Sequence, residues 1–186
     1  FHPCQGLYTS PGTPPHTAFI ATHYNVDFSE HYLGQFMADR GFGFLGWNTR
    51  FRGNEAFFLL EHALIDIGAG VRWLKDVKGI RNVVLLGNSG GGSLMAAYQS
   101  LAVSPVAQAT PGIPMPDAAR TLPACDFYVS LNAHRGRPEV LTEWMDPSIT
   151  DENDIASVDE TLNMYAPANG PPYSREFVSR YRAAQR

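Results

Sequence analysis

A regular alternation of strand-like and helix-like segments constrains this chain more than any other feature. Short apolar runs rich in β-branched residues are typical of buried strands, and they occur at residues 17–22, 42–48, 80–86 and 126–133. Helical patterns separate them, at residues 29–41, 56–78 and 94–102. Strands that alternate with helices form right-handed crossover units. The sequence therefore predicts an α/β protein, a three-layer α/β/α sandwich with a mostly parallel sheet.

The ends of these segments carry their own signals. Ser29 is predicted to cap the first helix and Gly41 to end it. Apolar residues recur every three or four positions through the second helix, at Leu60, Leu64, Ile67, Val71 and Leu74. Gly79 is predicted to close that helix. A short strand at residues 6–9 and a last helix at residues 174–185 complete the expected elements.

Length and charge limit the functions that the chain can have. With 186 residues it is expected to form one domain around one hydrophobic core. A net charge of −4 without a cluster of Lys and Arg argues against a nucleic-acid partner. No run of about 18 apolar residues is present, so no membrane span is expected. The six histidines lack metal-binding spacing, and neither a metal ion nor a cofactor is expected.

The two cysteines, Cys4 and Cys125, are too few for a disulfide framework. One bridge between them is the alternative to two free thiols. Free thiols in a reducing compartment are the simpler interpretation, which favours a cytoplasmic protein.

The segment Gly87-Asn88-Ser89-Gly90-Gly91 matches the pattern G-x-S-x-G, with a buried strand before it and a helix directly after it. A serine on such a strand-to-helix turn is expected to have a positive φ, and its neighbours at two positions on either side must be small. The turn exposes the hydroxyl and directs the Gly90 N–H at an oxyanion. These features predict that Ser89 is a nucleophile.

Two other functions compete with that of a nucleophilic serine. A glycine-rich turn between strand and helix can also hold a phosphate, but the Lys of a P-loop and the spacing G-x-G-x-x-G are absent. The sequence GNSGG is close to the GDSGG of chymotrypsin-like proteases. That fold is all-β, and it would not place helices on both sides of the serine strand.

In these segments the chain resembles the α/β-hydrolase superfamily over residues 6–135, with signs of truncation at one or both ends. TAFIATHYN is similar to the third strand and its H-G-x loop, with His23 at the histidine position. FGFLGWNTRFRGNE is similar to the fourth strand and its loop, and VVLLGNSGGGS to the fifth strand and the nucleophile elbow. The resemblance implies a second oxyanion donor, the backbone N–H of Tyr24 or Asn25. Tyr24 stands where the family has glycine.

The resemblance also implies a triad in the chain order Ser, acid, His. After Ser89 the one histidine is His134, at the end of the predicted strand 126–133, where the family does not place its base. We therefore expect the acid and base to lie beyond Arg186, with His134 as the alternative base. Carboxylates that follow this strand are Glu139, Glu143 and Asp146. Residues 140–186 would then be cap segments, whose aromatic residues Trp144, Tyr165 and Tyr173 are candidates to line an acyl site.

Taken together, the residues and the resemblance predict a serine hydrolase that cleaves a carboxylic ester or related acyl substrate through an acyl-enzyme at Ser89. The alternative is a non-catalytic binding module on a truncated hydrolase fold. A truncated core exposes apolar sheet surface, so association into a homo-oligomer is a further expectation.

Overall fold

The computed structural model describes residues 3–105, 110–154 and 156–186. The chain divides into two compact units, Phe1–Arg135 and Gly136–Arg186. The boundary coincides with the end of the predicted core, residues 6–135.

The first unit is built on a five-stranded sheet in the order β1-β3-β2-β4-β5. Its strands are β1 (Gln5–Thr9), β2 (Thr17–Ala21), β3 (Gly43–Asn48), β4 (Asn82–Asn88) and β5 (Phe127–Leu131). β1 pairs with β3 in the antiparallel sense, and all the other pairs are parallel. The mostly parallel sheet predicted by the alternation of segments is confirmed.

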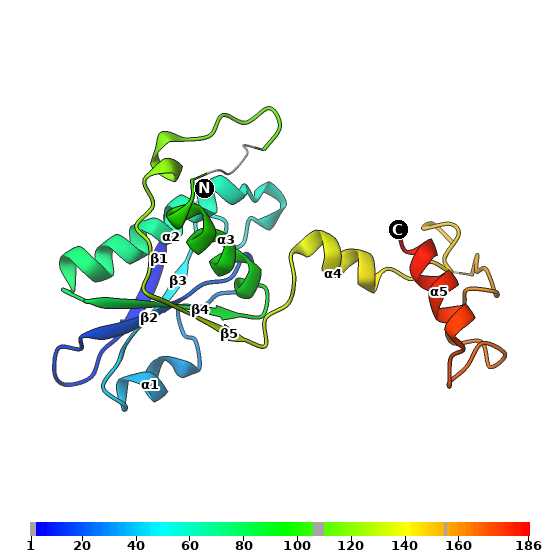
Figure 1. The fold of residues 1–186 in the computed structure, drawn as a ribbon, viewed down its shortest axis with the longest axis horizontal. Helices are drawn as coiled ribbons and strands as arrows, with labels where there is room; N and C mark the ends of the chain where they lie inside the picture. Colours follow the sequence, from blue (N-terminus) through cyan, green and yellow to red (C-terminus); the bar gives the residue numbers. More distant parts are fainter. Residues whose placement is uncertain (1–2, 106–109, 155) are drawn as a thin grey trace. The chain divides into compact units, whose positions relative to one another are not determined.

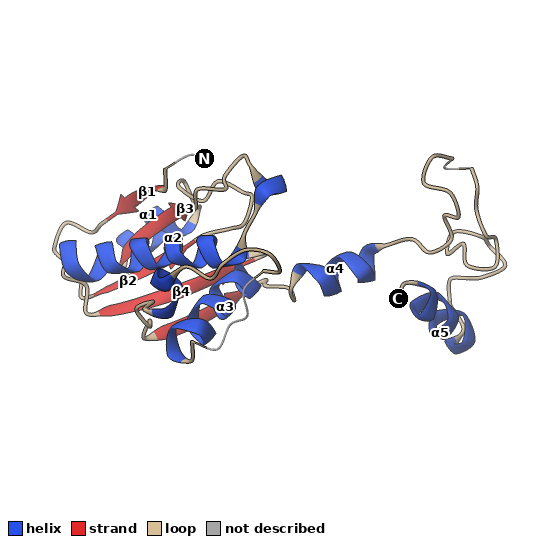
Figure 2. Cartoon of the chain, turned by 90° about the horizontal axis from the view of Figure 1, so that it is seen from above, coloured by secondary structure: helices blue, strands red, loops and turns tan. Residues whose placement is uncertain are grey.

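Helices cover both faces of this sheet. Figure 1 shows α1 (Leu33–Ala38) on one side and α2 (Leu60–Arg72) and α3 (Gly91–Val103) on the other, and Figure 2 shows α2 and α3 lying along the strands. Side chains alternate between the faces, as the two-residue period of a strand requires. Ile20 and Leu85 pack with α2 and α3, whereas Ala21 and Leu86 pack on the α1 side. The three-layer α/β sandwich is therefore confirmed.

The first helix begins later than predicted. α1 starts at Leu33 with Tyr32 in the N-cap position, and Ser29 does not cap it. Instead the backbone N–H and the hydroxyl of Ser29 both donate to Asp27 Oδ1, at 2.8 and 2.6 Å. An Asp two residues earlier offers this local acceptor, so the serine closes a turn rather than a helix.

The long predicted helix of residues 56–78 is divided into three parts. A 3₁₀ turn, η1 (Glu55–Phe57), precedes α2, and a π-helical turn, η2 (Trp73–Val77), follows it. Gly79 has a φ of +67° and ends the helical run, as predicted. A further 3₁₀ turn, η3 (Asp117–Arg120), lies in the long connection to β5.

The second unit contains α4 (Arg137–Trp144) and α5 (Arg175–Ala184). α5 was predicted, and Ser174 caps it by accepting the Phe177 N–H at 3.1 Å. α4 was not predicted: its sequence shows no strong apolar stripe. No helix in the described part of the chain is long and apolar enough to cross a membrane.

Candidate active site at the turn after strand β4

Ser89 occupies the tight turn between β4 and α3. Its φ is +54°, as the motif predicts, in a region that costs an L-residue about 1–2 kcal/mol. Hydrogen bonds hold this conformation from two sides. The Ser89 N–H donates to the carbonyl of Leu131 at 3.2 Å, and the Ser89 carbonyl accepts from the Gly92 N–H at 2.9 Å. The backbone of the predicted nucleophile is thus fixed by its own helix and by β5.

The glycines of the motif are required by close packing. A Cβ on Gly91 would run into the carbonyl oxygen of Thr22, at the end of β2. A Cβ on Gly87 would lie 2.8 Å from the Cα of Gly92, closer than such atoms approach. Backbone atoms cannot move aside as a flexible side chain can. The predicted need for small residues on both sides of Ser89 is therefore met.

Gly90 is the N-cap of α3, at the end of the helix where backbone N–H groups lack helical partners and the helix dipole is positive. A Cβ on Gly90 would collide with the ring of Tyr24 and lie 2.7 Å from His23 Nε2. The Tyr24 ring, at the position where the hydrolase family has glycine, therefore lies against the predicted oxyanion donor.

His23 organises the loop that follows β2. It is buried, with 7% of its surface exposed, and its Nδ1 accepts the N–H groups of Asn25 and Val26, each at 3.3 Å. Because Nδ1 is an acceptor, the neutral ring carries its proton on Nε2. The Asn25 N–H, predicted as an oxyanion donor, is thus engaged with His23 in this structure.

A histidine that sequence reasoning missed lies beneath the turn. His31 Nε2 is 3.2 Å from Asn88 Oδ1, and Asn88 Nδ2 donates to the Leu131 carbonyl at 3.0 Å. His31 Nδ1 accepts the Leu33 N–H at 3.3 Å. Burial lowers the pKa of His31 below its ordinary value. His31 and Asn88 are 57 residues apart, and no motif connects them in the sequence.

His134 lies three residues past β5, at the same edge of the sheet as Ser89, because Asn88 and Leu131 are paired at the ends of parallel strands. Its Nδ1 is 3.0 Å from the carbonyl of Arg135, which accepts. Nε2 is then the basic nitrogen of the neutral ring.

The carboxylates named as candidate acids lie in the second unit. Glu139 and Glu143 belong to α4. Asp146 Oδ1 accepts from the N–H and the hydroxyl of Ser148, at 3.0 and 2.7 Å. The contacts of Asp146 are thus local to the second unit.

Two ion pairs fix the loops around the turn. Asp27 accepts from Asn48 Nδ2 at 2.7 Å and pairs with Arg52 at 2.8 Å. Hydrogen bonds from Ser29 and Asn48 hold the pKa of Asp27 at about 2. The buried Asp66 of α2 accepts from the backbone N–H of Arg50 at 2.9 Å and from its guanidinium at 2.6 Å.

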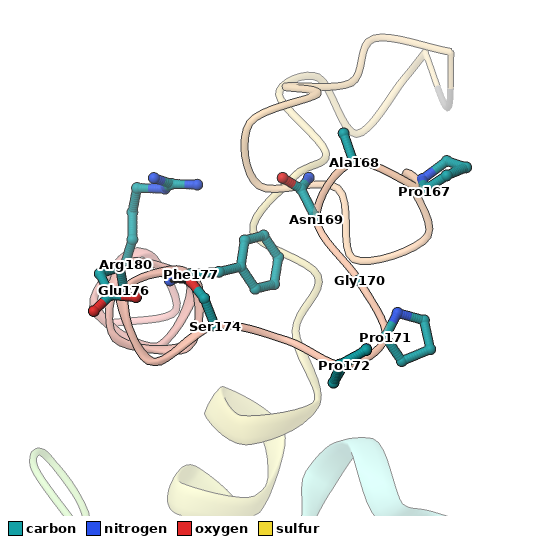
Figure 3. A pocket seen from close by; sticks show the side chains of 10 residues that line it. All are labelled: Pro167, Ala168, Asn169, Gly170, Pro171, Pro172, Ser174, Glu176, Phe177 and Arg180. Atoms are coloured by element: carbon teal, nitrogen blue, oxygen red, sulfur yellow. Dashed lines mark hydrogen bonds between the residues drawn. The ribbon is translucent and has the colours of Figure 1, made fainter.

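Two pockets lie among the described residues of the second unit, and Tyr173, one of the aromatic residues predicted to line an acyl site, lines the smaller one. The larger, of about 400 Å³, is formed by α5 and the segment before it, and Figure 3 shows the Phe177 ring directed toward the part that carries Asn169 and Gly170. Tyr173 lines a smaller pocket of about 210 Å³. Trp144 and Tyr165 are exposed. Within the described ranges, no cluster of three or more His, Cys, Asp or Glu side chains is arranged to hold a metal ion.

Comparison with known proteins finds likeness in structure alone. No protein-family model and no curated protein matches the chain. Esterase 2 of Thermogutta terrifontis, phosphoramylated by tabun, is 15% identical over 68% of this chain and 50% of its own, with a TM-score of 0.46. The paraoxon-phosphorylated form is 12% identical over 96% of this chain and 70% of its own, with a TM-score of 0.46.

A bacterial brefeldin A esterase, described as a homologue of human hormone-sensitive lipase, is 19% identical over 53% of this chain and 28% of its own, with a TM-score of 0.40. The chain thus spans about half the length of the first of these proteins. At such identities and TM-scores the likeness does not extend to a shared activity. The sheet order, the helical layers on both faces and the turn after β4 fit a partial α/β-hydrolase fold.

Proposed function

We propose that the protein is a serine hydrolase that cleaves a carboxylic ester or related acyl substrate through an acyl-enzyme at Ser89. One observation carries the proposal: Ser89 has a φ of +54° on a turn from a buried parallel strand to a 13-residue helix. A protein maintains such backbone strain where the position of a side chain matters. Gly87 and Gly91, which cannot be replaced without a collision, make the same turn possible.

In the proposed reaction the Ser89 hydroxyl attacks the substrate carbonyl, and its proton passes to a base. The oxyanion that forms is held by the Gly90 N–H, at the positive end of α3. The N–H of Tyr24 or of Asn25 supplies the second donor. Asn25 serves only after its N–H leaves His23 Nδ1. Collapse of the tetrahedral intermediate expels the alcohol, and water then hydrolyses the acyl-enzyme.

A fluorophosphonate probe tests whether Ser89 is activated. The probe forms a covalent adduct with an activated serine hydroxyl, which the mass of the intact protein reveals. We expect one adduct on the wild-type chain and none on Ser89→Ala. Ser100→Ala is the matched control, since Ser100 is an exposed serine of the same helix α3, and it should react like the wild type. A folded wild-type chain without an adduct would contradict the proposal.

The base is tested separately with His134→Gln. A glutamine keeps a polar side chain at this edge of the sheet but cannot accept the Ser89 proton as an imidazole does. If His134 is the base, the rate of labelling should fall at least a hundredfold, the usual contribution of a general base. Labelling at the wild-type rate would show that another group accepts the proton.

One observation favours the alternative, a non-catalytic binding module. The Tyr24 ring lies against Gly90, the residue whose N–H is the proposed oxyanion donor. If this ring closes the site, Tyr24→Gly should gain labelling at Ser89 while the wild type shows none. Equal labelling of both proteins would exclude a blocking role for Tyr24.

A further inference from the structure

His31 belongs to a chain of hydrogen bonds that ends at the Ser89 turn. The Leu33 N–H donates to His31 Nδ1, Nε2 of the same ring meets Asn88 Oδ1, and Asn88 Nδ2 donates to the Leu131 carbonyl. His31 lies in the loop before α1 and Leu33 at the start of that helix, whereas Asn88 and Leu131 end β4 and β5. The side chains of His31 and Asn88 therefore connect α1, β4 and β5.

The groups at the two ends of this series of hydrogen bonds, a backbone N–H and a backbone carbonyl, determine which atom donates in each bond. A backbone N–H can only donate, so His31 Nδ1 must accept from Leu33. A backbone carbonyl can only accept, so the Asn88 amide turns its NH₂ group to Leu131 and its oxygen to the ring. His31 Nε2 must then donate. A neutral imidazole with its proton on Nε2 satisfies both conditions, and no other form of the ring does.

The series of hydrogen bonds is connected to Ser89 because Asn88 and Ser89 donate to the same acceptor. The carbonyl of Leu131 accepts both the Asn88 Nδ2–H at 3.0 Å and the Ser89 N–H at 3.2 Å. Asn88 also directly precedes Ser89 in the sequence. The orientation of the Asn88 amide and the left-handed backbone of Ser89 are therefore coupled, because both depend on where this one oxygen lies.

The surroundings of His31 keep its ring neutral and in place. The ring is 9% exposed and lies against Phe28, Tyr32 and Phe44, with centroid distances of 4.8, 4.5 and 5.4 Å. Of these three neighbours Tyr32 alone is titratable. A second proton, on Nδ1, would face the Leu33 N–H and remove the first hydrogen bond of the series.

We infer that His31 is a positioning residue, which holds Asn88 and the Leu131 carbonyl so that the Ser89 hydroxyl is presented in its reactive orientation. The inference rests on the proposed function for the role of Ser89, but the hydrogen-bond chain exists whether or not the serine reacts. His31 touches neither the substrate nor the reacting atoms. It acts through Asn88.

Two substitutions separate positioning from packing. His31→Phe keeps an aromatic ring in the same pocket but removes the donor, and His31→Gln restores a donor without the ring. We expect His31→Phe to lower the rate of fluorophosphonate labelling at Ser89 about tenfold, with His31→Gln within about threefold of the wild type. Asn88→Ala should match His31→Phe. The double variant should be no slower than either single variant, because both break the same chain.

A measurement that needs no activity accompanies the labelling. Long-range ¹H–¹⁵N correlation spectra of the full chain report which nitrogen of His31 carries the proton. The expected spectrum shows the Nε2–H form in the wild type and a shifted Nε2 resonance in Asn88→Ala. A proton on Nδ1, or a spectrum that Asn88→Ala leaves unchanged, would overturn the inference.

The outcomes keep the two proposals apart. A wild-type chain that shows the Nε2–H form but takes no adduct would overturn the function of Ser89 and leave the chain of hydrogen bonds established. A wild-type chain that reacts at Ser89 as fast as His31→Phe would overturn the positioning role and leave the function standing. Slow labelling by His31→Gln, with His31→Phe at the wild-type rate, would assign His31 to packing and also overturn the role.

Discussion

Ser89 holds a conformation that serine rarely adopts. Its N–H is tied to the Leu131 carbonyl, and its own carbonyl is tied to the Gly92 N–H. A net gain of about 0.5–1.5 kcal/mol for each bond is enough to offset a left-handed residue. Hydrogen bonds within the chain therefore hold the turn, as the electrostatic stabilisation of a transition state requires.

The titration of His31 gives the first prediction. Burial lowers its pKa in the folded protein, so in acid the unfolded chain binds a proton more readily. The free energy of unfolding should then fall as the pH drops below about 6.5, by at most about 1.4 kcal/mol per pH unit. Urea denaturation at pH 7.5 and 5.5 measures this loss.

The control for this prediction is His31→Gln, which lacks the titrating group and should lose less stability over the same interval. Both pH values lie above the range in which the Asp27 carboxylate titrates. The pKa of Asp27 is about 2 in the folded protein, so its contribution disappears only below its ordinary value near 3.9. Equal losses for the wild type and for His31→Gln would contradict the prediction.

Gly91 gives the second prediction. A methyl group at this position meets the Thr22 carbonyl, and two backbone segments would have to separate. Gly91→Ala should lower the free energy of unfolding by about 2–3 kcal/mol, as overpacking of a rigid site does. Gly12→Ala is the matched control: a Cβ there meets nothing within 4 Å, and the expected change is within about 0.5 kcal/mol. Equal effects of the two substitutions, measured by urea denaturation, would refute the steric argument.

At the scale of elements, the ion pair of Arg50 and Asp66 joins the loop after β3 to the middle of α2. Asp66 is 2% exposed and accepts from the backbone and the guanidinium of Arg50. Asp66→Ala leaves these donors without an acceptor. We expect a loss of about 2–3 kcal/mol, below the range for a fully buried pair because Arg50 is one-third exposed.

Thermal or urea unfolding beside Asp76→Ala checks this expectation. Asp76 is an exposed acid in η2, directly after α2, and its removal should change the stability by less than about 0.5 kcal/mol. A loss below 1 kcal/mol for Asp66→Ala would show that the pair does not anchor the loop.

The elements that sequence reasoning found are those with a strong local pattern. The strand of residues 80–86 and the helix of residues 56–78 are apolar with clear periods, and both exist, although the helix divides into three parts. α4 was missed because Val140 is the one buried residue among its eight, so burial leaves no stripe in the sequence. The predicted cap at Ser29 is wrong because Asp27, two residues earlier, accepts both the N–H and the hydroxyl of this serine.

In the candidate site, too, the features with a local sequence pattern could be predicted and the others could not. The positive φ of Ser89 and the need for Gly87 and Gly91 follow from one local motif. The contact of His31 with Asn88 joins residues that are far apart in the chain, and it depends on how α1 packs beneath the sheet. The position of the Tyr24 ring on Gly90 likewise depends on the loop conformation. Such contacts are properties of the tertiary structure, and a single sequence does not display them.

At the scale of the whole molecule, β5 is an edge strand without the usual protection. Among the described strands it pairs with β4 alone, and Phe127, Tyr128 and Val129 are 60%, 39% and 39% exposed. No Lys, Arg, Glu or Pro interrupts its sequence FYVSL. Natural sheets use such residues at their edges to prevent association with another chain. We propose this edge as the surface through which two copies of the chain would pair.

Val129→Lys tests this expectation. A charge in the middle of the strand should shift the self-association of the chain to higher protein concentration, because pairing would bury the ammonium group. Sedimentation velocity over a range of concentrations measures the change. Val103→Lys adds the same charge at an exposed position near the end of α3 and should leave association as it is in the wild type. Equal shifts for the two variants would argue against pairing at the β5 edge.

The Leu131 carbonyl accepts two hydrogen bonds, and this limits where residues can be inserted in the chain. A residue inserted within β5 would displace this carbonyl from the Ser89 N–H and move Ala133 away from Gly92, against which it is packed. After Arg135, where the second unit begins, added residues disturb neither contact. Changes of length between Leu131 and Arg135 are therefore expected to disturb the turn that carries Ser89, whereas changes of length after Arg135 are expected to leave it in place.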